Sequence, residues 1–166
     1  MEQNWYAVYT SARAEKKVKE RFDESGIENY LPLRTEIRIW SDRKKKVLFP
    51  LIPGYIFVYV SPDNFLRVLN IPGVVSFLKE KAIPVAIPDN QIRRLRMMVD
   101  YAIDEVEYCS SPIEIGDVVE VQQGELKGLT GELVEMRGKY KIVIRLQYFG
   151  CALTTIPLGW VKKQNI

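Results

Sequence analysis

Between residues 50 and 60 the chain carries the alternating pattern of a β-strand. Two prolines and a glycine precede a run of apolar and aromatic residues, and successive strand residues point to opposite faces. One face then holds the aliphatic Ile56, Val58 and Val60, and the other holds the aromatic Tyr55, Phe57 and Tyr59. The aliphatic face predicts a wall of the core. The aromatic face allows two interpretations: the second buried face of a central strand, or a docking surface for another protein.

The rest of the first hundred residues predicts a mixture of strands and helices. Residues 5–10 form an aromatic-rich strand in which Trp5, Ala7 and Tyr9 share a face, so a second aromatic row can lie beside residues 55–59. Ala14, Val18 and Phe22 recur every four residues and predict a helix that ends at residues 25–26. Further strands are expected over 27–40, 47–60, 74–78 and 82–87, and further helices over 62–69 and 88–99. This region is therefore expected to be α+β, with an antiparallel sheet and flanking helices.

The last third of the chain has a different sequence pattern, in which short apolar segments are separated by turn residues. Residues 105–112 are acidic, then small and polar, and end in proline, which predicts a linker. Short strands separated by turn signals follow over 118–121, 133–136, 140–147, 152–156 and 160–163. So short a chain without helices buries enough core by curling into a small five-stranded β-barrel. The predicted organisation is a first domain over 1–104, a linker over 105–112 and a barrel domain over 113–166.

Composition narrows the classes of function. The chain has 24 basic and 21 acidic residues and no histidine. The absence of histidine removes the commonest general base and metal ligand, so we expect neither an enzyme nor a metal or cofactor site. Two isolated cysteines and the lack of a long apolar run predict a cytoplasmic protein with reduced thiols and no membrane segment, and we expect a monomer.

Three sets of residues are candidates for binding. Arg43, Lys44, Lys45 and Lys46 follow Ser41–Asp42 and predict a basic hairpin tip, which either keeps the protein soluble or contacts phosphate. Arg13 and Lys17 are nucleic-acid candidates by charge and position on the first helix. The barrel region contains a glycine-punctuated loop with Gly124, Lys127, Gly128 and Gly131, whose glycines we interpret first as mechanical features of a bend.

Taken together, these segments resemble the NusG family. Residues 5–9, 53–58 and 71–74 are similar to its amino-terminal domain, and residues 116–121 with the glycine loop are similar to its KOW motif, which forms an SH3-like barrel. The resemblance implies a transcription elongation and antitermination factor that binds the clamp helices of RNA polymerase through an aromatic and aliphatic patch. The resemblance implies that the residues of this patch are Tyr9, Ile52, Tyr55 and Phe57 in this chain.

The resemblance also implies further partners. These are non-template DNA or nascent RNA for the first domain, and a termination factor or a small-subunit ribosomal protein for the KOW domain. The chain looks most similar to specialised paralogues, RfaH and the capsular polysaccharide antiterminators of Bacteroides-type bacteria, which implies a restricted set of operons. The His-Thr-Thr polymerase contact of RfaH has no match near residues 65–67. The alternative function is an RNA-binding or ribosome-associated KOW module.

Overall fold

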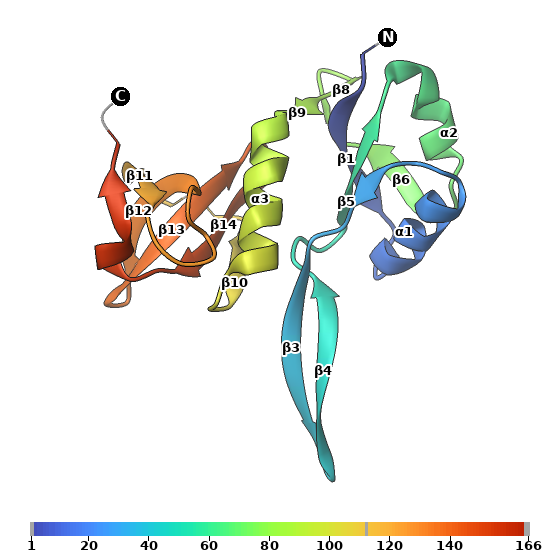
Figure 1. The fold of residues 1–166 in the computed structure, drawn as a ribbon. Coiled ribbons are helices and arrows are strands. Elements are labelled where there is room, and N and C mark those ends of the chain that lie inside the picture. The colour runs from blue at the N-terminus through green and yellow to red at the C-terminus, as the bar shows by residue number, and fades with distance from the viewer. Residues whose placement is uncertain (1, 112, 165–166) are drawn as a thin grey trace. The chain divides into compact units, whose positions relative to one another are not determined.

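The computed structural model describes residues 2–111 and 113–164 (Figure 1). It contains two compact units, Met1–Ile92 and Arg93–Ile166, and the division falls within helix α3 (Asp89–Tyr101). Among the described residues, no helix is long and apolar enough to cross a membrane.

The first unit is built on an antiparallel sheet. Its strands lie in the order β2 (Asn29–Tyr30), β5 (Tyr55–Val60), β1 (Asn4–Thr10) and β6 (Val74–Phe77), and β9 (Ala86–Ile87) also pairs with β1. The pairing of β1 with β5 sets Trp5 opposite Tyr59, Ala7 opposite Phe57 and Tyr9 opposite Tyr55. The two aromatic rows predicted from alternation therefore lie side by side on one face of the sheet.

The other face of this sheet carries the core. Helix α1 (Glu15–Glu24) contributes Val18 and Phe22, and the short helix α2 (Phe65–Leu69), which follows a 3₁₀ turn at Pro62–Asn64, contributes Val68. These side chains form one buried cluster with residues of β1 and β5, including Val8, Ile56, Val58 and Val60. The α+β class with helices flanking an antiparallel sheet is confirmed.

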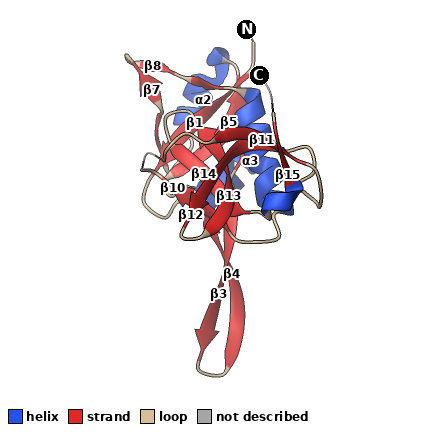
Figure 2. Ribbon diagram, turned by 90° about the vertical axis from the view of Figure 1, so that its left-hand side faces the viewer, coloured by secondary structure: helices blue, strands red, loops and turns tan. Residues whose placement is uncertain are grey.

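A long hairpin leaves this unit between Pro32 and Leu51. Strands β3 (Leu33–Trp40) and β4 (Arg43–Pro50) pair along their whole length and project as a two-stranded ribbon (Figure 2). Trp40 pairs with Arg43, so only Ser41 and Asp42 form the turn. The prediction of a basic tip over residues 41–46 is wrong in this respect: Arg43 to Lys46 lie in β4, where their backbones pair with Ile37 to Trp40. A smaller ladder joins β7 (Lys79–Glu80) to β8 (Ile83–Pro84).

The second unit contains an all-antiparallel sheet. Its order is β10 (Val106–Cys109), β14 (Gly150–Thr155), β13 (Lys139–Leu146), β12 (Thr130–Met136), β11 (Asp117–Val121) and β15 (Val161–Lys163), with a 3₁₀ turn at Leu158–Trp160. The five predicted strands are present. The closure of this sheet into a KOW barrel stays a prediction, because the pairing runs from β10 at one edge to β15 at the other.

Much of the segment expected to be a linker is a strand. Val106–Cys109 pair with Cys151–Thr154 of β14, and Pro112 lies outside the described residues, as do residues 165–166 of the predicted barrel domain. Cys109 and Cys151 are directly opposite each other in this ladder and are both free thiols. Burial raises the pKa of the Cys151 thiol to about 11, so this thiol stays protonated at neutral pH. The predicted domain bounds otherwise stay a prediction.

Candidate functional site

The aromatic face of β1 and β5 carries ring pairs along its length. The rings of Trp5 and Tyr59 are 5.2 Å apart at one end, and those of Tyr9 and Tyr55 are 5.2 Å apart at the other with an interplanar angle of 61°. Between them, Phe57 stacks on Tyr30 of β2 at 6.4 Å. Cross-strand register thus gathers rings from three strands that are distant in sequence.

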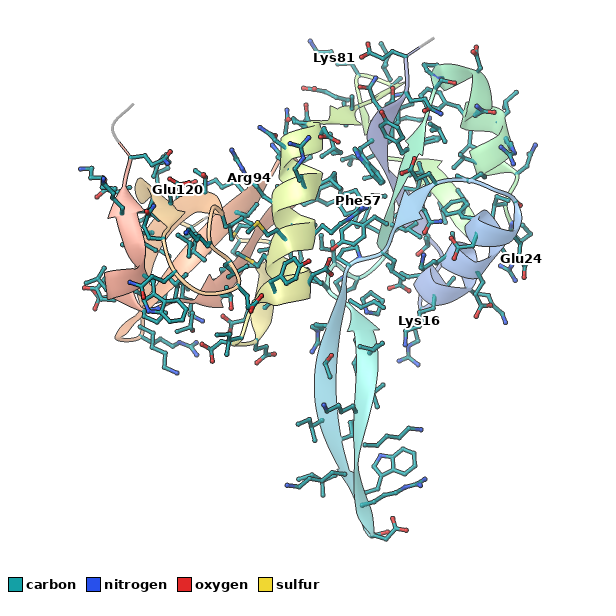
Figure 3. All side chains as sticks on the ribbon, in the orientation of Figure 1. Lys16, Glu24, Phe57, Lys81, Arg94 and Glu120 are labelled. Atoms are coloured by element: carbon teal, nitrogen blue, oxygen red, sulfur yellow. The ribbon has the colours of Figure 1, made fainter. Side chains whose placement is uncertain are left out.

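The four residues predicted to bind polymerase differ in exposure. Tyr9 is 45% exposed and Tyr55 is half-buried, whereas Ile52 (1%) and Phe57 (0%) are buried. Figure 3 labels Phe57 on β5, and its side chain is fully buried. The structure therefore brings Tyr9 and Tyr55 together as an accessible pair, and it does not bring Ile52 or Phe57 to the surface. Alternation assigned Phe57 to the right face but carries no information about what covers that face.

A glycine turn fixes the position of the Tyr9–Tyr55 pair. The backbone N–H of Thr10 donates to the carbonyl of Gly54 at 2.8 Å, and the N–H of Gly54 donates to Oε2 of the buried Glu15 at 3.1 Å. Gly54 has φ +86°, and a Cβ there would lie 3.3 Å from Cε2 of Tyr9. A side chain would therefore be strained and would press on the ring. The Pro-Gly doublet signals this turn in the sequence, but nothing in the sequence identifies Glu15 as its anchor.

Burial affects the ionisation of Tyr55, the half-buried member of the pair. Desolvation raises the pKa of Tyr55 above its usual value of 10.0, and the neighbouring Tyr9 adds a smaller effect in the same direction. The pair can therefore offer a partner apolar ring surface, and Tyr55 does so without introducing charge.

Part of the predicted nucleic-acid set lines a hollow beside α1. Arg13, with φ +61°, and Lys16 line one side of a cavity of about 540 Å³, and Arg34 and Arg38 of β3 line the other. Figure 3 shows Lys16 on α1 near the base of the hairpin. Lys17 is not among the lining residues and instead pairs with Glu20 at 3.7 Å. Lys16, Arg34 and Arg38 were missed, because their convergence depends on where the hairpin leaves the sheet.

The glycine loop of the second unit has clear mechanical roles. Gly124 has φ +80°, and a Cβ there would lie 2.5 Å from the Trp160 ring. A Cβ at Gly131 would lie 2.7 Å from the carbonyl oxygen of Val143 on the paired strand. Gly128 has φ +95° and donates its N–H to the Val121 carbonyl at 2.8 Å. Of the four predicted loop residues, only Lys127 presents a side chain, which is exposed.

Comparison with known proteins decides the family. A family model described as "Transcription termination factor nusG" matches residues 3–96, more than half of the chain. The chain belongs to the NusG family. It is 28% identical to the transcription termination/antitermination protein NusG of Rickettsia bellii over 97% of this chain and 90% of that protein. It is also 28% identical to the NusG of Bacillus subtilis, over 90% and 92% of the two chains.

A solved structure agrees in fold. Thermotoga maritima NusG covers 99% of both chains with a TM-score of 0.57 and 21% sequence identity. The NusG-like fold, an amino-terminal α/β domain followed by an antiparallel β region, is therefore confirmed. Membership in the NusG family also makes this protein a non-enzymatic transcription termination/antitermination factor.

Proposed function

We propose that this NusG-family protein binds RNA polymerase at the clamp helices through the aromatic face of β1 and β5 and thereby suppresses pausing and termination. The observation that carries the proposal is the Tyr9–Tyr55 ring pair, which forms the accessible end of a face whose other rings are packed against one another. Aromatic side chains held in a fixed geometry lose little entropy on binding, and such residues dominate interface energies. Ile52 and Phe57 are buried and are therefore not part of the accessible surface.

The test is a double substitution of the accessible pair. We expect Tyr9→Ala with Tyr55→Ala to weaken binding to core RNA polymerase by roughly 30-fold, the equivalent of about 2 kcal/mol. Phe57 is a poorer target, because truncating a fully buried ring costs about 3–5 kcal/mol of folding stability. Circular dichroism establishes that the variant is folded.

Tyr101→Ala is the matched control, because Tyr101 is a tyrosine of the second unit with 52% exposure. It is expected to bind polymerase as the unmodified protein does. A folded Tyr9/Tyr55 variant with unchanged affinity would remove the proposed surface.

The specialised role is a finer proposal that rests on sequence detail. Loop and helix segments of the first unit look most similar to RfaH and the capsular polysaccharide antiterminators, and we propose action on a restricted set of operons. Depletion of the protein followed by transcript profiling tests this. Loss of read-through confined to a few long operons supports the restriction, and a uniform change across the genome contradicts it.

The second unit is proposed to recruit a partner. Its glycine loop offers Lys127 as an exposed cation next to Gly128, whose φ of +95° favours glycine. A small-subunit ribosomal protein or a termination factor is the proposed partner, and the site of action is the cytoplasm, with the protein as a monomer. Lys127→Glu is expected to weaken recruitment of that partner while leaving polymerase binding intact.

An RNA-binding or ribosome-associated module is the second candidate function. It would use the second unit together with the cations Arg43 to Lys46, and it predicts RNA binding in the absence of polymerase that weakens steeply as salt rises. No measurable RNA binding without polymerase would contradict it.

A further inference from the structure

The two cysteines of the chain meet in the second unit. Cys109 is the last residue of β10 and Cys151 is the second residue of β14, and the two are direct partners in the antiparallel ladder. Direct cross-strand partners point to the same face of a sheet. Cys109 also packs against the buried cluster that contains Cys151 and Leu153. The two thiols therefore lie on one side of the ladder and next to each other.

The ladder places these thiols within reach of a covalent bond. Direct partners in an antiparallel pair have Cα atoms about 4.5 or 5.5 Å apart, depending on whether they exchange backbone hydrogen bonds. Both separations fall within the range of about 4.4–6.8 Å that disulfides span. Both cysteines are free thiols in the structure. A bond between them therefore requires rotation of the two side chains and little movement of the strands.

The two thiols differ in how easily a small molecule reaches them. Cys109 is half-buried and lines a groove of about 210 Å³ together with Arg137 and Lys141. Cys151 is 1% exposed, and desolvation, with a further effect from the neighbouring Cys109, raises the pKa of its thiol to about 11. A small oxidant can therefore reach Cys109 from the groove, whereas the protonated and covered Cys151 is protected until its neighbour has reacted.

We propose that Cys109 and Cys151 form a reversible disulfide when the protein meets hydrogen peroxide. The Cys109 thiolate, having released its proton to solvent, attacks one peroxide oxygen. An S–O bond forms, the O–O bond breaks, and the hydroxide that leaves takes up a proton to become water. The sulfur of Cys151 then attacks the Cys109 sulfenic acid. The S–S bond forms, the S–O bond breaks, and the oxygen leaves as water with the Cys151 proton.

The electrons and protons of this reaction balance. The two thiols together lose two electrons and two protons, and these reduce one hydrogen peroxide to two molecules of water. A dithiol reductant reverses the reaction by thiol–disulfide exchange. In a reducing compartment the bond is therefore transient, as is typical of redox-sensing cysteines.

The bond fastens a short edge strand to its sheet. β10 has four residues and lies at one edge of the sheet, next to β14. Edge segments with few partners open more easily than the centre of a sheet. A disulfide between Cys109 and Cys151 closes the loop of residues 110–150 and keeps β10 attached even when its backbone hydrogen bonds break. This effect goes beyond docking on polymerase and does not depend on it.

The first test identifies the bond. The reduced full chain is treated with a slight excess of hydrogen peroxide, and its peptides are mapped by mass spectrometry without reduction. We expect the Cys109 and Cys151 peptides to be joined in most molecules, and a dithiol to release them. Oxidation of Met136, which lines the same groove, is scored on its own peptide. Cross-links between chains, or Cys109 carried on to sulfinic acid beside a reduced Cys151, would overturn the proposal.

Two single variants assign the order of the steps. Cys151→Ala is expected to stop the reaction at the Cys109 sulfenic acid, which dimedone traps. Cys109→Ala is expected to slow the loss of the remaining thiol to peroxide at least tenfold. Because Cys109 is half-buried, this second variant remains informative even if truncation of the buried Cys151 weakens the fold. Thiol loss at an unchanged rate in Cys109→Ala would overturn the assignment of Cys109 as the first to react.

Amide hydrogen exchange measures the consequence for β10. Oxidation is expected to slow exchange at residues 106–109 at least tenfold and to leave β1 and β5 unchanged. Cys109→Ala treated in the same way should show no change. Unchanged exchange in the disulfide-bonded protein would overturn the fastening of β10. The Tyr9/Tyr55 double variant should form the disulfide as the unmodified protein does, so a failure of the proposed function and a failure of this inference are distinguishable.

Discussion

The β1–β5 pair and the β3–β4 hairpin are both antiparallel ribbons, but their faces are covered by other side chains to different extents. In β1–β5 one face lies in the core with Val18 and Phe22, and the other carries the packed aromatic rings. In the hairpin, Ile37, Ile39 and Trp40 are exposed at 62%, 77% and 48%, so neither face has a covering layer along most of its length. The same backbone pairing therefore supports a stable core in one place and leaves two exposed surfaces in the other. The second layer, and not the pairing, decides which role a strand has.

The largest difference in stability between the two ribbons is expected when a carboxylate is introduced at an aliphatic position of each. Val58→Asp places a charge in the core cluster without a partner and is expected to cost about 4 kcal/mol or more, which unfolds the first unit. Ile39→Asp is expected to change stability by about 0.5 kcal/mol or less, because the side chain is already in water. Urea denaturation followed by circular dichroism measures both. A similar loss of folding stability in the two variants would show that Ile39 is packed against other side chains in solution.

A second test separates backbone strain from packing within the first unit. Gly73 and Gly26 both have positive φ, at +95° and +70°, so alanine is strained at either position by about 1–2 kcal/mol. A Cβ at Gly73 would also lie 2.7 Å from Cγ2 of Val18, whereas at Gly26 the nearest atom is 3.9 Å away. We expect Gly73→Ala to be the more destabilising by at least about 1 kcal/mol, as measured by thermal unfolding. Equal melting temperatures for Gly73→Ala and Gly26→Ala would mean that helix α1 shifts at little energetic cost to make room for the added Cβ.

The smallest expected effect lies at the solvent edge of the packed sheet. The side-chain hydrogen bond from Asn29 lowers the pKa of Asp23, and Lys19 lowers it further. A carboxyl whose pKa is lower in the folded state stabilises the fold above its unfolded pKa, and this contribution is lost as the pH falls through the folded pKa. Because the pair is exposed, we expect Asn29→Ala to cost about 0.5 kcal/mol or less through Asp23 at pH 7, and this part of the cost should vanish in strong acid.

An NMR titration of the Asp23 carboxyl checks this directly. In Asn29→Ala the pKa of Asp23 should rise toward its ordinary value of 3.8. An unchanged titration curve would show that the hydrogen bond across α1 and β2 is absent in solution.

Much of the fold could be predicted from the pattern of hydrophobic residues. The errors in the predicted strands occur in segments that lack such a pattern. Alternation in residues 55–60 correctly assigned Ile56 and Val58 to the core, because a buried face imposes apolar residues at every second position. Residues 43–46 have no such alternation, since both of their faces meet water, and they were wrongly assigned to a turn. Val106–Cys109 form a strand only by pairing with residues more than forty positions later, which their acidic surroundings conceal.

The candidate site shows the same limit. Sequence pattern identified Tyr9 and Tyr55 as members of one aromatic face, and register then brought them into contact. It did not reveal that Phe57 and Ile52 are buried, nor that Glu15 holds the Gly54 turn, because these depend on tertiary packing. The alternation of the hairpin cations Arg43 to Lys46 between the two faces of the ribbon follows from period-two geometry once the strand is known.

The base of the hairpin, here called the neck, is closed by a backbone hydrogen bond, so the hairpin is structurally separate from the sheet. The N–H of Leu51 donates to the carbonyl of Pro32 at 2.8 Å, so the chain closes on itself where the ribbon begins. Of the ribbon residues, Leu33 packs against the core cluster of the first unit. Cross-strand pairs can therefore be added or removed beyond this neck, one pair at a time, without changing the face on which the remaining residues lie. A change in the length of the hairpin would therefore leave the sheet that carries it unchanged.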